Sequence, residues 1–287
     1  MTQRVSDQMV TFAPGTVAMA SELVYSNLTG SPGRLPLPAM WLQGLNIANN
    51  AGDATNDIDI AEGQCRDATN TNNLLLSAIT KQLDVAWVVG TNQGMLATGV
   101  GVTNTTYHLF AILRPDTGVV DIAADTSVTG ANVTANTNAA YTKMRRIASI
   151  MRVGGVNTPF VQDGDYFRRK ASIQDVSTTN PGTGAVTATL SVPTGLNLLA
   201  FGNANVIDTA QASIMYLSDL AANDEAPSHT AAPQGQGAVS ASAAYIHFPW
   251  TIRSKTSSQI RSRMSLSGAS NIVHITTLGW FDSRGRT

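Results

Sequence analysis

The chain has 287 residues and a mass of 30.1 kDa, with a formal net charge of −1 and only 13% charged residues. Soluble domains carry about 25% charged residues, so this surface must be neutral and polar or be buried against other subunits. A hydrophobic content of 43% excludes a disordered chain, and the near-zero net charge argues against nucleic-acid binding, which needs a basic surface.

Cellular context is indicated by three further features. Cys65 is the single cysteine, so no intrachain disulfide forms, and we expect a partly buried, inert thiol. No apolar run approaches the roughly 18–20 residues that cross a bilayer, and residues 1–8 lack the apolar centre of a signal peptide. We therefore expect a chain that is made and folded in a cytoplasm, without membrane insertion.

Residues 1–39 are predicted to form an extended N-terminal arm. Prolines and glycines interrupt the segment and leave room for a short strand or turn around 20–25. The arm is nevertheless too apolar for a solvated tail, since it contains Val5, Met9, Val10 and Phe12. We expect it to attach the chain to another protein.

Residues 40–176 are predicted to form a first β-sandwich-like module, because runs of β-forming residues alternate with Asn, Thr, Asp and Gly. Pro115 and Gly118 mark a turn, since proline fixes φ and glycine supplies a positive φ. We therefore expect 106–114 and 118–123 to form a hairpin. The strands expected in this module are 40–48, 56–61, 106–114, 118–123, 143–153 and 159–170.

One stretch of this module departs from the strand rhythm. Its apolar residues are spaced i, i+3, i+7, i+10 and i+11, and the run ends at Gly90, a suitable helix C-cap. We predict a short helix at 77–89, with a strand as the alternative because the stretch also contains Val85, Val88 and Val89. The residues of the stripe are Leu76, Ile79, Leu83, Ala86 and Trp87.

Residues 177–287 are predicted to form a second β-sandwich-like module, beginning at a Ser/Thr/Asn/Pro/Gly tract over 177–184. Apolar and polar residues alternate strictly over 245–252, and Pro249 there indicates an edge or bulged strand. Residues 227–241 are expected to form a surface loop. The strands expected are 185–192, 197–206, 211–218, 239–252, 259–266 and 271–281.

The densest acidic cluster comprises Asp53, Asp57, Asp59 and Glu62. Carboxylates two apart on a strand project from one face, which would allow Asp57 and Asp59 to share a calcium ion. The spacing does not match a helix–loop–helix calcium loop, however, and Asp or Asn at strand ends usually caps turns. Turn capping is therefore the favoured interpretation, and we assign no metal site.

Asp163-Gly-Asp165 presents a second pair of carboxylates. Asp-Gly is a favoured type I′ pair, so we predict a tight turn between two strands. Enzymes that cleave polysaccharides place two carboxyl groups roughly 5–9.5 Å apart. Asp57/Asp59 and Asp163/Asp165 are the candidates for such a pair, and this enzymatic alternative is disfavoured.

Other reactive side chains do not form a recognisable catalytic set. Gly-x-Ser-x-Gly is absent, so no Ser/His/Asp triad can be nominated, and we assign no catalytic residue and no cofactor. The four histidines, His108, His229, His247 and His274, are widely spaced. His108 and His274 are expected to be hydrogen-bonded sheet residues.

Basic residues cluster in two runs and at the C-terminus. On alternating strands the two runs would form a stripe that contacts an acidic surface or glycan, but an exposed face or inter-subunit ion pairs are the favoured interpretation. For the C-terminal Arg284 and Arg286 both interpretations stay open. These residues are Lys143, Arg145, Arg146, Arg152, Arg168, Arg169, Lys170, Arg284 and Arg286.

Several segments together resemble a region of tailed-bacteriophage tail-fibre and related virion proteins. The resemblance covers roughly residues 40–287 and lies in the order of the motifs. It implies a non-enzymatic virion component, often trimeric, and supplies no catalytic or receptor-contact residues. The segments are 49–67, 83–94, 106–110 (Thr-Tyr-His-Leu-Phe), 145–150, 160–165 and 277–286.

The sequence therefore predicts an all-β protein with two β-sandwich-like modules, one short helix and an extended N-terminal arm. The expected function is that of a fibre or spike of a tailed-phage virion, on the tail or baseplate. It would form a homotrimer, dock on other virion proteins through the arm, and hold a host surface glycan. The alternative is a capsid decoration or head-fibre protein without receptor binding.

Overall fold

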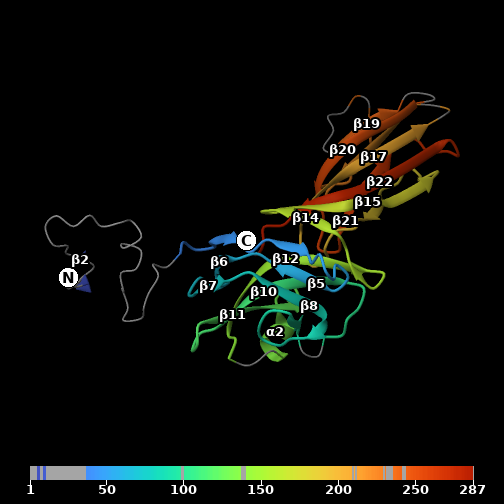
Figure 1. Ribbon diagram of the computed structural model, residues 1–287. Helices are drawn as coiled ribbons and strands as arrows, with labels where there is room; N and C mark the ends of the chain where they lie inside the picture. Colours follow the sequence, from blue (N-terminus) through green and yellow to red (C-terminus); the bar gives the residue numbers. More distant parts are fainter. Residues whose placement is uncertain are drawn as a thin grey trace, which may run out of the picture.

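The computed structural model describes residues 5–6, 9–10, 37–97, 100–136, 140–208, 210, 212–228, 230, 235–240 and 244–286. These residues are almost entirely β-strand, with one six-residue helix, and they form two stacked sandwich-like modules (Figure 1). The expected all-β class with two such modules and one short helix is confirmed. Within the described part of the chain, no helix has the length and apolar character needed to cross a membrane.

The first module packs an eight-stranded mixed sheet against a three-stranded antiparallel sheet. The eight strands, in spatial order, are β13 (Val156–Asn157), β12 (Lys143–Val153), β10 (Thr106–Arg114), β11 (Val119–Asp125), β9 (Gln93–Leu96), β8 (Ile79–Ala86), β5 (Asp57–Ile60) and β4 (Ile47–Asn49). The three strands are β3 (Leu42–Gly44), β6 (Gly63–Arg66) and β7 (Asn73–Leu76).

The centre of the large sheet is buried on both faces. Every residue of β10 except Arg114 is buried, which explains its near-continuous apolar sequence. One face packs against the three-stranded sheet, and the other is covered by a second apolar cluster that includes Phe110, Val133 and Tyr141. The expected hairpin is confirmed: Arg114 pairs with Val119.

The helix predicted at 77–89 is wrong, and the strand alternative is confirmed. Leu76 ends β7, residues 77–78 connect the two sheets, and β8 begins at Ile79. Lys81 and Leu83 of β8 are both buried and share one face at the strand period of two. The one helix of the described chain is α2 (Ala131–Asn136), where Asp125 accepts hydrogen bonds from the Asn132 and Val133 backbone.

The strand expected at 40–48 is divided into β3 and β4. Gly44 and Leu45 both have positive φ, which breaks the strand between the two sheets. A Cβ at position 44 would lie 2.4 Å from the Glu62 carbonyl oxygen, so glycine is required there on two grounds.

The second module consists of a five-stranded and a four-stranded antiparallel sheet. The five strands, in spatial order, are β14 (Phe160–Asp163), β15 (Tyr166–Thr179), β22 (Asn271–Phe281), β17 (Leu199–Asp208) and β20 (Ala244–Arg253). The four strands are β16 (Val186–Thr189), β21 (Gln259–Met264), β18 (Ser213–Ser218) and β19 (Gln236–Ser240).

The edge position expected for the Pro249 strand is confirmed, because β20 ends the five-stranded sheet. The loop expected at 227–241 needs correction, since its described part contains β19, which pairs with β18. The side chain of Gln236 on β19 bonds the backbone nitrogen and oxygen of Thr251 on β20. This bridge satisfies part of the free edge of β20.

The change from one module to the other lies earlier in the chain than the expected boundary at 176/177. That boundary falls inside β15, and both β14 and β15 belong to the five-stranded sheet. The turn between them is the predicted two-residue connection, at Gly164 and Asp165. Gly164 has a positive φ and Asp165 does not, which is the type II′ pattern and not the expected type I′ pattern.

Of the expected arm, residues 1–39, the structure describes two short strands and residues 37–39. β1 (Val5–Ser6) and β2 (Met9–Val10) pair with each other in antiparallel register. The strand or turn expected around 20–25 lies outside the described residues.

The two modules share one apolar core. A single cluster of buried side chains runs from Leu45 and Ile58 in the first module to Trp250 and Trp280 in the second. The edge strands β4 and β14 also meet, because the Gln162 side chain accepts a hydrogen bond from the Ile47 backbone at 2.7 Å. We therefore regard the modules as two halves of one rigid body.

Candidate functional site

The acidic residues of 53–62 form turn caps and cross-strand bonds. Asp53 accepts hydrogen bonds from the backbone of Thr55 and Asn56. Asp59 accepts one from the Asn50 amide at 2.8 Å and one from the Thr80 hydroxyl at 2.7 Å. Burial and the nearby Asp53 carboxylate raise the pKa of Asp57. Among the described residues, no group of three or more acidic, histidine or cysteine side chains could hold a metal ion.

Asp163 and Asp165, the second carboxylate pair, make different contacts. Asp165 forms an ion pair with Arg286, and its backbone oxygen accepts a hydrogen bond from the Asp282 amide. Asp163 ends β14 and pairs with Tyr166 across the turn. Asp165 thus ties the C-terminal residues to the start of the second module.

Most of the basic residues expected on one stripe point into the protein. Arg145 is 1% exposed and bonds the carbonyl oxygens of Arg66 and Gly285. Arg152 and Arg169 are also buried and bond backbone oxygens of Thr55 and Ser191. The exposed members are Arg168 and Lys170.

Arg146 and Asp282 form a buried clamp between the modules. The two terminal guanidinium nitrogens of Arg146, Nη1 and Nη2, each donate to one Asp282 oxygen at 2.6 Å, and the side chains are 8% and 0% exposed. Arg284 adds to the clamp by donating to Ile147, Gly44 and Leu45 carbonyl oxygens. The C-terminus accordingly returns to the first module (Figure 1).

A β-bulge in β12 makes the contact between Arg284 and Ile147 possible. Phe110 pairs with Arg146 and Leu109 with Ala148, so Ile147 has no opposite residue on β10. Its carbonyl oxygen instead accepts a hydrogen bond from the Arg284 Nε at 2.8 Å. The bulge thereby provides an acceptor for a side chain that is 137 residues away in sequence.

Cys65 lies in the core of the first module and is 0% exposed. Burial raises the pKa of its thiol to about 12. Because the thiolate is the reactive form, this cysteine is inert at neutral pH. The thiol is fully buried, where the sequence indicated partial burial.

His108 is a buried neutral histidine beside the clamp. It pairs with Ser149 across the ladder, and its Nδ1 lies 2.8 Å from the Ser149 hydroxyl. Burial, followed by the nearby Arg146 guanidinium, lowers the pKa of His108 to about 4. The interpretation of His108 as a hydrogen-bonded sheet residue is confirmed.

Acidification should destabilise the protein through His108. Its folded pKa lies below its ordinary value of 6.5, so the unfolded chain binds the extra proton as the pH falls from 6.5 toward 4. At about 1.36 kcal/mol for each pKa unit, the free energy of unfolding should fall by roughly 2–3 kcal/mol between pH 7.5 and 4.5. Urea unfolding of wild type and His108→Gln measures this effect. An equal pH dependence in both proteins would contradict it.

An aromatic platform lies on the outer face of the five-stranded sheet and consists of Tyr166, Phe201 and Phe281. The Tyr166 and Phe201 rings stack with centroids 5.1 Å apart, and Phe281 contacts both, at 5.3 and 5.7 Å. Phe281 is 41% exposed, whereas its neighbour Trp280 faces the core. We define these three residues as the platform.

The strand register explains why the platform forms. Tyr166, Phe281 and Leu199 pair in one row across β15, β22 and β17. In the next row, Phe201 pairs with Gly279. A Cβ on Gly279 would lie 2.5 Å from the Phe201 ring, so the glycine leaves room for this ring over β22.

Neutral polar side chains continue the outer face beyond the platform. Thr276 pairs with Asn203 and Gln174. His274 pairs with Asn205, which pairs on its other side with His247. The structure thus places His247 and His274 in one cross-strand row, on either side of Asn205, while His229 lies outside the described residues.

A groove of about 710 Å³ opens beside the platform at the junction of the modules. Such a volume lies within the range of about 300–1,000 Å³ for small-molecule sites. Phe281, Leu199 and Arg253 form one wall, and Asn197, Thr256 and Ser283 lie in the same lining. Among the described residues, the side chains of these last three have no hydrogen-bond partner.

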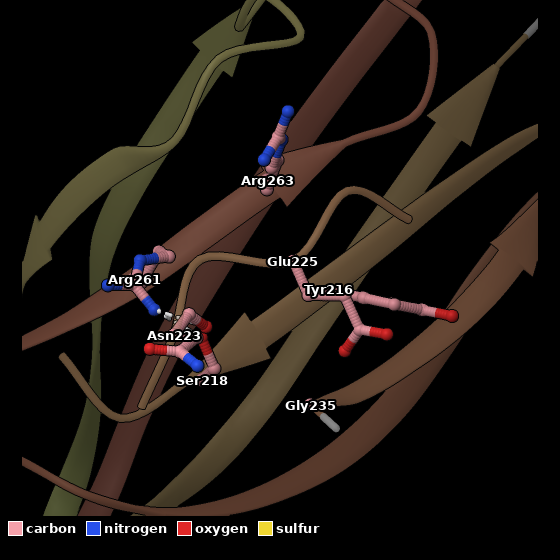
Figure 2. A pocket seen from close by; sticks show the side chains of 7 residues that line it. All are labelled: Tyr216, Ser218, Asn223, Glu225, Gly235, Arg261 and Arg263. Atoms are coloured by element: carbon pink, nitrogen blue, oxygen red, sulfur yellow. Dashed lines mark hydrogen bonds between the residues drawn. The ribbon is translucent and has the colours of Figure 1, made fainter. Parts of the chain in front are cut away.

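In three other hollows, polar groups of the lining already form hydrogen bonds with other residues of the chain. A hollow of about 640 Å³ along β4 and β5 contains the Asn50–Asp59–Thr80 bonds, and one of about 440 Å³ contains the Gln236 bridge. Figure 2 shows the smallest, of about 10 Å³, where Arg261 donates to the Asn223 carbonyl oxygen at 3.1 Å. We therefore take the platform and its groove as the candidate functional site.

No family model and no curated protein matches this chain. Among solved structures it is similar to a Bacillus thuringiensis Cry1Da tryptic core variant, at 9% identity over 85% of this chain and 52% of that chain, with a TM-score of 0.20. It is also similar to a structure of the infectious bursal disease virus Gx strain, at 11% identity over 84% and 68%, with a TM-score of 0.20. The chain spans about half the length of the Cry1Da core, and TM-scores this low carry no argument.

Proposed function

We propose that this chain is a structural virion protein of a tailed bacteriophage, a fibre or spike that adheres to the host surface. It acts as a homotrimer, attaches to other virion proteins through residues 1–39, and performs no catalysis. The observation that carries the proposal is a charge-poor β-body with a shared core, exposed apolar side chains and an aromatic platform whose Phe281 ring is exposed.

The exposed apolar residues support permanent self-association. Val88, Val153 and Val161 are 48%, 55% and 52% exposed, and Val89 and Val156 are 48% and 41% exposed. With charged residues at only 13%, the surface offers few charges to keep copies apart. Burial of such residues between subunits is favourable by about 25 cal/mol for each Å² of apolar surface.

The rigid fusion of the modules supports a mechanical role. A shared core and the Arg146–Asp282 clamp hold the two halves in one arrangement. An adhesion module gains avidity when several copies present weak sites in a fixed geometry. The platform lies on an outer face, where a host surface can reach it.

Immunogold labelling of intact particles that carry this chain tests the proposal. Antibodies raised against the purified protein should label fibres or spikes at the tail or baseplate. Antibodies absorbed with the purified protein provide the control. Labelling distributed over the head surface would contradict the tail assignment and favour the decoration alternative.

A further inference from the structure

We propose that the aromatic platform and its groove form a binding site for a saccharide chain that carries carboxylate groups. This inference rests on the proposed adhesive role and names the site and the chemical class of its ligand. Pyranose rings have apolar C–H faces and hydrogen-bonding edges, so they require both flat apolar surfaces and neutral polar groups. In the platform, the exposed Phe281 ring supplies the apolar aromatic surface, beside the half-buried Tyr166 and Phe201 rings.

A row of side chains that runs through the platform is long enough for more than one sugar ring. Register places Tyr166, Phe281, Leu199 and Arg253 in one row across four adjacent strands. With strands about 4.8 Å apart, the row is roughly 14 Å long. An extended saccharide can therefore lie across the strands and make several ring contacts.

Hydrogen-bonding groups lie on both sides of the row. On one side the groove presents the Asn197, Thr256 and Ser283 side chains, and on the other lie Thr276 and Asn203. These groups are uncharged, so sugar hydroxyls can replace their water without the cost of burying an unpaired charge.

Arg168 supplies the selectivity for carboxylates. It lies two residues after Tyr166 on β15, pairs with Gly279, and is exposed. Among the described residues its guanidinium has no ion-pair partner, in contrast to Arg253 and Arg286, which pair with Asp219 and Asp165. A guanidinium binds a carboxylate through two parallel hydrogen bonds, which favours uronic-acid units over neutral sugars.

A printed panel of purified bacterial capsular and O-chain polysaccharides, both acidic and neutral, provides the test. Wild type should bind acidic members, and the tightest binder is then titrated by calorimetry. Phe281→Leu keeps apolar bulk but removes the flat ring and should weaken binding at least about tenfold. Arg168→Gln should lower the preference for acidic over neutral chains.

Tyr245→Ala is the matched control, because Tyr245 is 68% exposed at the far end of β20, where it pairs with Ile207. It should bind like wild type, and thermal unfolding confirms that each variant is folded. Absence of binding across the panel, or equal binding by Phe281→Leu, would overturn the inference. A changed oligomeric mass in Phe281→Leu would also overturn it and assign the platform to a contact between copies.

The binding experiment and the labelling experiment can fail independently of each other. Labelling on tail fibres together with no polysaccharide binding removes the saccharide site alone. Polysaccharide binding together with labelling on the head removes the tail assignment but leaves the site.

Discussion

Replacing Lys81 with methionine is expected to lower the free energy of unfolding by about 3–5 kcal/mol. Lys81 and Asp121 are both 0% exposed, and their nearest charged atoms lie 3.2 Å apart. The ammonium also bonds the carbonyl oxygens of Val88 and Gly90. The variant leaves the Asp121 carboxylate buried without its cation, which is the source of the loss.

Urea unfolding at pH 7, followed by tryptophan fluorescence, measures this effect. Lys143→Met is the matched control, because Lys143 is only half-buried and bonds the Thr71 hydroxyl. A substitution of this kind should change stability by no more than about 0.5 kcal/mol. Equal losses in the two variants would show that the buried Lys81–Asp121 pair contributes no more to the free energy of unfolding than a surface lysine does.

Asp282→Asn is expected to have a comparable effect, also about 3–5 kcal/mol, because it leaves the Arg146 guanidinium buried without a counter-ion. The amide keeps the shape of the side chain, so the change isolates the charge. Since the clamp joins the two halves, the variant should also expose the junction to proteolysis before the modules unfold. Unfolding curves and limited proteolysis report the two effects.

Arg253→Gln is the control for the clamp. It breaks the Arg253–Asp219 pair, whose side chains are 51% and 25% exposed. Surface pairs of this kind contribute about 0–1 kcal/mol. If Asp282→Asn is as mild as Arg253→Gln, the C-terminal residues do not fasten the modules as described.

The strands could be predicted well from the sequence because alternation and turn residues are local signals. Residues 106–114 and 143–153 were predicted with the observed bounds, and 271–281 likewise. The edge position of the strand with Pro249 followed from the missing backbone donor of proline. These signals need no knowledge of partners far along the chain.

The helix prediction at 77–89 failed because apolar residues of two successive strands can imitate the spacing of a helical stripe. Leu76 and Ile79 belong to different strands, β7 and β8. Lys81 lies between the apolar residues of that stripe, and it is buried with a partner 40 residues away. Only the tertiary structure shows that partner.

The exposed face expected for the basic residues was wrong for a related reason. Adjacent residues on a strand point to opposite faces, so Arg145 and Arg146 lie on opposite faces of β12. Both are buried, because the three-stranded sheet and the C-terminal residues cover the two faces of β12. Asp282 lies 136 residues away, beyond the reach of a local pattern.

The candidate site was missed from the sequence because its aromatic rings come from three separate strands. Tyr166, Phe201 and Phe281 each look like an ordinary strand residue. The signal that could have found them is the alternation in β15, β17 and β22, which places each ring on the outer face. Their adjacency depends on a strand order, β15-β22-β17, that the sequence does not display.

The mass of the purified protein in solution tests most directly whether this chain works as a self-associating virion component. Analytical ultracentrifugation at micromolar concentration and physiological salt should give about three times the 30.1 kDa chain mass. The mass should stay constant on tenfold dilution. A stable single-chain mass throughout would contradict the account.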